Sequence, residues 1–204
     1  MWWMSNALYV AGGITLTEFG RLMGETLDEA VRWEEFLAGR RDPSPTQKGM
    51  SKIGKVEERF PGAAKCWNSP IWKIQRERWL SPDELAAAID KLPSPISSAL
   101  TVFRMPVDVG VLRLPDEAVR QLAGHISFEA LEALVLLANF AWNARSLELA
   151  QDVQAAYQQL SPKLKNLPEV GKVANKIFPH FDSFLKMLSG LLRRQRINRL
   201  GLAM

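Results

Sequence analysis

Residues 127–143 read SFEALEALVLLANFAWN, and this segment decides the fold class. A serine that can cap a helix precedes apolar residues that recur at helical spacing. They are Leu131, Leu134, Val135, Ala138 and Trp142. The longest apolar stretch, 133–142, is about half of the roughly 20 residues that a membrane-spanning helix needs. The segment therefore predicts a buried helix and argues against a membrane span.

Helix-start signals recur on either side of this segment. Thr15 with Glu18, and Thr26 with Glu29, have the spacing of a capping box. Residues 81–84, Ser-Pro-Asp-Glu, combine a capping serine, a proline at the first helical position and two carboxylates that favour a helix start. Further helices are expected at 46–60, 115–124, 127–143, 145–160, 162–178 and 179–200. The chain is therefore predicted to be all-α.

Prolines suggest how the helices are divided between domains. Pro93, Pro95 and Pro106, together with Gly110, fall between two helix-rich stretches. We expect a helical unit with a helix-turn-helix-like start over 1–92, a proline-rich linker over 93–114 and a C-terminal helical bundle over 115–204.

Composition limits the class of protein. Of the 204 residues, 47% are hydrophobic and 24% are charged, which is typical of a globular fold. The single cysteine, Cys66, excludes an intrachain disulfide and fits a reducing compartment. The first residues lack the basic region of a signal peptide. We expect a cytoplasmic protein without a membrane partner, which starts at Met1 or Met4.

No residue pattern indicates a metal site or a catalytic site. Cys66, His125 and His180 lie far apart in the sequence, whereas metal ligands usually cluster at short spacing. Carboxylates such as Glu34 and Glu35 are adjacent in sequence and point in different directions on a helix, so they do not form a catalytic pair. We expect no catalytic residue, no metal, no cofactor and no enzymatic activity.

Positive charge is concentrated in two segments. Residues 40–80 hold ten Lys or Arg against four Asp or Glu, a net +6, and residues 161–204 hold nine against two, a net +7. Each segment can face an anionic partner or simply be solvated. The same alternatives hold for the tail at 191–200, which is an amphipathic basic helix that either contacts nucleic acid or an acidic partner or leaves its polar face in water.

Residues 15–45 carry the one family resemblance. TLTEFGRLMG at 15–24 is followed by ETLDEAVRW at 25–33 and EEFLAGRRDPS at 34–44, and this text resembles a helix-turn-helix of the phage-repressor (Cro/Xre) kind. The segments 56–62 and 69–72 also look like bacterial proteins with such an N-terminal unit. The resemblance implies DNA binding by residues 26–36, a basic loop on the phosphates, and a homodimer that reaches two half-sites. The nucleic-acid-binding residues implied are Thr26, Arg32, Arg40, Arg41, Lys48, Lys52 and Lys55.

The segment corresponding to the recognition helix is acidic, which leaves two hypotheses open. Carboxylates such as Glu34 and Glu35 are repelled by a phosphate backbone. Either the DNA contact comes from the basic residues around 40–55, or the chain is a protein–protein module, such as an inhibitor, immunity protein or adaptor. Three tryptophans are then either partner-binding anchors or structural core. They are Trp67, Trp72 and Trp79.

Overall fold

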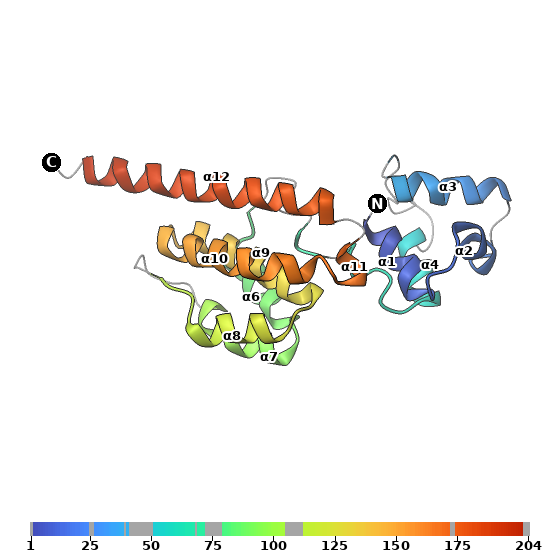
Figure 1. Cartoon of the computed structure of the whole chain (residues 1–204), viewed down its shortest axis with the longest axis horizontal. Helices are drawn as coiled ribbons and strands as arrows, with labels where there is room; N and C mark the ends of the chain where they lie inside the picture. Colours follow the sequence, from blue (N-terminus) through green and yellow to red (C-terminus); the bar gives the residue numbers. More distant parts are fainter. Residues whose placement is uncertain are drawn as a thin grey trace. The chain divides into compact units, whose positions relative to one another are not determined.

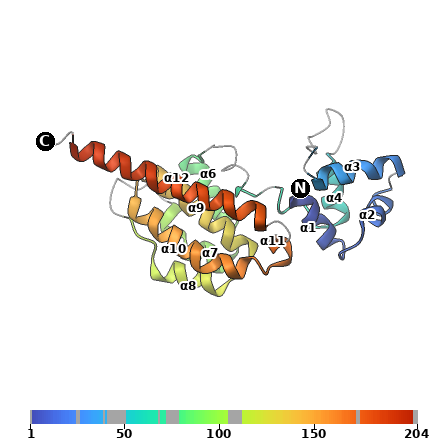
Figure 2. The ribbon, with the colours of Figure 1, turned by 45° about the horizontal axis from the view of Figure 1, so that its top comes forward.

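The computed structural model confirms the all-α class (Figure 1). It describes residues 2–24, 27–38, 40, 51–67, 69–71, 79–104, 112–171 and 174–201. No strand occurs among these residues. The chain forms two compact units, 1–69 and 70–204, and each has its own core. Figure 2 shows the helices of each unit in a second view.

The described part of the first unit contains four helices, and a capping box marks the start of the second one. These helices are α1 (Trp2–Val10), α2 (Leu16–Leu22), α3 (Leu27–Ala38) and α4 (Lys52–Arg59). The Thr15 hydroxyl accepts the Glu18 backbone N–H at 3.2 Å, and the Glu18 carboxylate accepts the Thr15 N–H at 3.1 Å, which confirms this predicted capping box. The Thr15 backbone N–H and, with a smaller effect, the Thr15 hydroxyl, which also donates to the Glu18 carboxylate at 3.1 Å, lower the pKa of Glu18. After α2, Gly24 adopts φ +72°, a left-handed conformation that glycine adopts without steric cost.

Helix α1 has no counterpart in the sequence analysis. Trp3, Met4 and Ala7 are buried, so α1 contributes to the core of its unit. Its residues, WWMSNALYV, offer neither a capping residue at the start nor a clear division into apolar and polar faces. Tertiary packing therefore supplies the stability that local signals do not.

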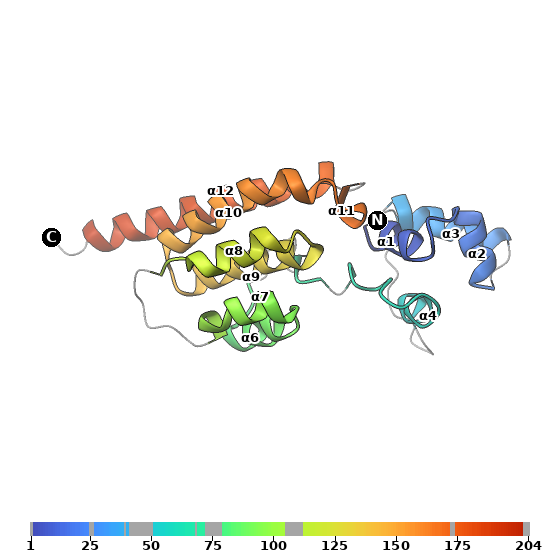
Figure 3. The same ribbon diagram turned by 60° about the horizontal axis from the view of Figure 1, so that its bottom comes forward.

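The second unit is built around α9 (Phe128–Asn143), which is apolar on nearly all sides. Every residue from 133 to 141 is buried. The helix packs against α6 (Pro82–Asp90), α10 (Leu147–Leu164) and α12 (Ala174–Gly201), which accounts for its continuous apolar sequence. Figure 3 shows α9 inside the unit, with α6 toward one side and α12 toward the other. The predicted buried helix is confirmed.

The division into units differs from the predicted one. Helix α6 falls within the predicted first unit of 1–92, yet it packs on α9 of the second unit. Residues of the predicted linker form α7 (Ser94–Ala99) and the 3₁₀ helix η1 (Thr101–Arg104), which pack on α8 (Asp116–Gly124) and α6 respectively. The prolines do not mark a linker, because Pro93 and Pro95 lie at the start of α7. Backbone N–H groups in the first turn of a helix make no hydrogen bond within that helix, so a proline there removes none. Residues 105–111 lie outside the described part.

Two further prolines do not end helices where the sequence predicted. Helix α10 continues through Pro162 to Leu164, and α12 runs through Pro179. Pro162 occupies the last turn of its helix. Pro179 lies beside aromatic side chains that pack across the α10–α12 contact, with the Tyr157 ring 5.9 Å from Phe178 and 4.7 Å from Phe181. This packing offsets the cost of one lost backbone hydrogen bond. Between the two long helices lies the short α11 (Pro168–Gly171).

Two asparagines on α9 hold the segment that precedes α6. The Asn139 Oδ1 accepts the Leu80 N–H at 3.1 Å, and the Asn143 Nδ2 donates to the Leu80 carbonyl at 2.9 Å. Asn139, which is fully buried, also donates to the Val135 carbonyl at 2.9 Å. Because residues four apart share one helix face, the pair satisfies both backbone polar groups of one residue, Leu80.

Replacing Asn139 with leucine should destabilise the second unit. The Leu80 N–H would then be buried without an acceptor, at a cost of about 1–3 kcal/mol. Urea unfolding would measure the change. The exposed Asn198→Leu on α12 is the control and should change stability by less than about 0.5 kcal/mol. Equal stability of both variants would show that the Leu80 hydrogen bond contributes nothing.

Candidate nucleic-acid interface

The first unit contains the helix pair that the resemblance predicts as a DNA-binding element. Helices α2 and α3 pack on each other, with the Phe19 and Trp33 rings edge to face at 5.1 Å. On α3, Trp33 and Phe36 are buried, and the helix also packs on α1. One face of α3 is therefore committed to the core, while Arg32 and Glu34 on other faces are exposed.

Aromatic contacts fix α3 within this unit. Trp3 of α1 lies 6.5 Å from Trp33 and 5.8 Å from Phe36, with tilted or edge-to-face rings. Phe60, after α4, stacks on Phe19 at 5.3 Å. Such ring pairs contribute roughly 0.5–1.5 kcal/mol each beyond the area they bury. The exposed side of α3 is thus presented from a rigid support.

Side-chain hydrogen bonds join α1 and α4 to the turn that follows α4. The Asn6 Nδ2 donates to the carbonyls of Gly62 and Ala63 at 3.0 and 3.1 Å. The Glu57 carboxylate accepts the N–H groups of Gly62 and Ala64 at 2.8 and 2.6 Å. Both polar sides of the turn are therefore satisfied, and Glu57 is a structural carboxylate rather than a site for a ligand. Nothing in the local sequence pattern indicated either role.

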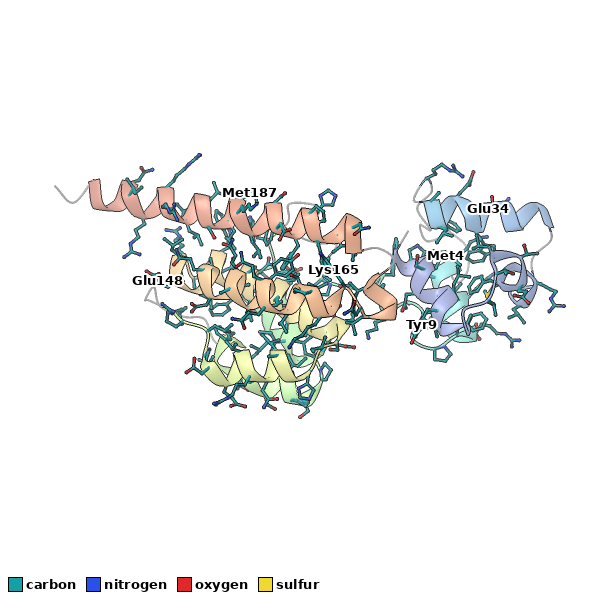
Figure 4. All side chains as sticks on the ribbon, viewed as in Figure 1. Met4, Tyr9, Glu34, Glu148, Lys165 and Met187 are labelled. Atoms are coloured by element: carbon teal, nitrogen blue, oxygen red, sulfur yellow. The ribbon has the colours of Figure 1, made fainter. Side chains whose placement is uncertain are left out.

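Charge on the exposed side of α3 is mixed. Arg32 and Glu34 are both exposed, and Figure 4 shows where Glu34 lies on α3. Arg40, just after the helix, is exposed, and its backbone N–H donates to the Glu35 carbonyl at 2.9 Å. On α4, Lys55 is exposed. The predicted DNA contacts that the structure describes thus lie on α3, directly after it, and on α4.

Lys52 differs from the other predicted phosphate contacts. Its side chain is half-buried, and the ammonium nitrogen lies 4.9 Å from the Trp33 ring centroid and 5.8 Å from that of Phe36. A cation over an aromatic face is stabilised by the ring quadrupole. Lys52 therefore connects α4 to the aromatic core, a role that its place in a basic sequence segment did not reveal.

The remaining predicted site residues fall into two groups. Thr26, Arg41, Lys48 and Trp72 lie outside the described residues. Trp67 and Trp79 are both half-buried and packed within their own units. Trp67 lies edge to face on Trp3 at 6.3 Å, and Trp79 stacks on Trp142 at 4.7 Å. These contacts favour the structural-core alternative for both tryptophans.

Comparisons with known proteins give no assignment. No protein-family model, no characterised protein and no solved structure matches the chain. Within the described residues, no group of three or more His, Cys, Asp or Glu side chains is placed to hold a metal ion. Nor does any described helix combine the length and apolar character needed to cross a bilayer.

Substituting the two lysines of α4 one at a time should distinguish a lysine that stabilises the fold from one that only adds surface charge. Lys52→Ala removes the cation from Trp33 and Phe36 and should lower the free energy of unfolding by about 0.5–1 kcal/mol. Lys55→Ala removes the same charge from an exposed position and should change it by less than about 0.5 kcal/mol. Thermal and urea unfolding provide the measurements. A larger loss from Lys55→Ala would contradict the assignment.

Proposed function

We propose that this chain is a bacterial DNA-binding protein of the transcription-regulator type, and that its first unit contacts the duplex. The observation that carries the proposal is the α2–α3 pair. Its second helix is fixed through Trp33 and Phe36. Among the described side chains of this helix, Arg32, Glu34 and Ala38 are exposed. A helix supported in this way can enter a major groove, which is wide enough to admit it.

Electrostatics determine how such a helix could dock. Glu34 is exposed on α3 and would be repelled by phosphates. Arg32, Arg40 and Lys55 are exposed cations of the same unit. Phosphate contacts position a protein on DNA without reading its sequence, so these three residues are assigned that role. Lys52 is left out of this set because its ammonium lies over the aromatic core.

Self-association belongs to the same proposal. A single helix-turn-helix reads one half-site, and a symmetric dimer reads two. The second unit, whose core forms around α9, is the part of the chain available for this purpose.

A protein–protein module is the second candidate. Three large apolar side chains of the first unit are well exposed: Tyr9 at 48%, Leu22 at 39% and Val10 at 38%. Figure 4 shows Tyr9 on α1. These exposed apolar side chains, and separately the exposed Glu34 of α3, are features suited to a protein partner rather than to DNA.

Binding to random-sequence duplex DNA at about 50 and 200 mM salt tests the proposal. The observed affinity should fall steeply with salt, because each neutralised phosphate contributes about 0.9 to the logarithmic slope. A triple variant, Arg32→Gln, Arg40→Gln and Lys55→Gln, should reduce that slope by up to about 2.7.

A charge-matched control makes the result specific. Lys91→Gln, Arg120→Gln and Lys163→Gln remove the same charge from exposed positions on or next to three other helices, α6, α8 and α10. This control should keep the wild-type slope. If wild type shows no binding at the lower salt, or if both triple variants behave alike, the assignment of the first unit to DNA is wrong and the protein–protein candidate takes its place.

A further inference from the structure

We infer that the outward face of α12 in the second unit is a separate binding surface for the phosphate backbone of duplex DNA. This surface consists of Lys186, Arg193 and Arg194, and it is distinct from the α2–α3 pair. The inference therefore stands or fails independently of the role proposed for the first unit.

The positive charge of α12 follows the one acidic residue of this helix, Asp182, which is exposed about one turn before Lys186. From 183 to 204 the chain contains five Lys or Arg and no Asp or Glu. Cations near a helix C-terminus also complement its dipole, but that effect is confined to about the last turn. Lys186 lies fifteen residues before the last residue of α12, Gly201, so the dipole does not account for its presence.

Packing fixes which side of α12 faces outward. Leu185, Leu188 and Leu192 are at most 2% exposed, and α12 packs on α10 and α9. Arg196 also points to the bundle, since its guanidinium pairs with the Glu148 carboxylate of α10 at 2.6 Å. The pKa of Glu148 is lowered by a hydrogen bond from the Glu148 backbone N–H and, with a smaller effect, by Arg196. Arg196 is therefore occupied and does not belong to the proposed surface.

Three of the four other cations share the opposite side, and the fourth, Arg199, lies outside the side chains that the structure describes. At about 100° per residue, Lys186, Arg193 and Arg194 fall within an arc of about 100°. Gly190 lies between them, and a side chain added there would meet nothing within 4 Å. Met187, at the edge of this arc, is 45% exposed, and Figure 4 shows it on the side of α12 away from α10. The three cations thus project from a rigid helix on a side that is open.

The dimensions and chemistry fit a phosphate backbone. Eight residues separate Lys186 from Arg194, a rise of about 12 Å along the helix. For a helix parallel to the duplex axis, this distance corresponds to between three and four nucleotide steps of about 3.4 Å each along that axis. Arginine donates two parallel hydrogen bonds to a phosphate, and two of the three cations are arginines.

An anionic bilayer fits this surface less well. A helix that lies in a membrane interface inserts a wide apolar face. In α12 that face is already buried in the bundle, and among the described side chains of the helix only Met187 and Ile197 are large, apolar and exposed. A nucleic-acid backbone requires only the cations.

The test uses the full-length chain, random-sequence duplex DNA and salt titration. The variant Lys186→Gln, Arg193→Gln and Arg194→Gln should weaken binding on the order of tenfold or more at low salt and reduce the logarithmic slope by about 2.7. The control Lys91→Gln, Arg120→Gln and Lys163→Gln should leave both values unchanged. A second variant, Arg193→Lys and Arg194→Lys, keeps the charge and should keep the slope. Circular dichroism and thermal unfolding should match wild type for all variants.

Each outcome decides between the surfaces. Loss in the α12 variant with retention in the Arg32, Arg40, Lys55 variant supports this inference and contradicts the proposed role of the first unit. The reverse result overturns the inference and leaves that role intact. An α12 variant that matches the control also overturns it. If Met187→Ser and Ile197→Ser abolish binding to phosphatidylserine vesicles while DNA binding is unaffected by the α12 variant, the surface belongs to a membrane and the inference is wrong.

Discussion

The burial of α9 on nearly all sides is the constraint on which the second unit depends. A helix without a polar face cannot remain in water, so other helices must cover it, and α6, α10 and α12 do so. Burial leaves no water to satisfy the polar side chain of Asn139, which bonds instead to the Leu80 N–H and the Val135 carbonyl. The same constraint fixes α12, because the side of α12 facing the core must be apolar and its charges are confined to the other sides.

The core of the first unit is formed by aromatic rings from several helices rather than by one apolar helix. This unit is short, and Trp3, Phe19, Trp33 and Phe36 supply large buried areas from few residues. Edge-to-face ring pairs constrain orientation as well as distance, so α3 is held by geometry on two neighbours. Asn6 and Glu57 form hydrogen bonds to the turn after α4 and thereby hold that turn against the same core.

Signals carried by neighbouring residues were predictable from the sequence, and signals that depend on distant partners were not. The capping box at Thr15 and the helix of 127–143 were predicted because caps and periodicity are local. Helix α1, the domain boundary and the continuation through Pro179 were missed, because each depends on packing between segments far apart in the chain. For the candidate site, exposure of Arg32, Arg40 and Lys55 agrees with a surface role. The place of Lys52 over Trp33 could not be deduced from a charge run.

Several charged side chains of this chain have structural roles, and excluding them reduces the number of residues that are candidates for binding a partner. Lys52 stabilises an aromatic core, Glu57 satisfies a turn, and Arg196 pairs with Glu148. A net charge of +4, or a segment of +6, counts all such residues as if they faced solvent. Once these three groups are set aside, the proposed DNA contacts are exposed cations on and next to α3, on α4, and on one side of α12. If both surfaces bind one DNA molecule, the second contact becomes intramolecular, and two weak sites yield a strong one without any further contact.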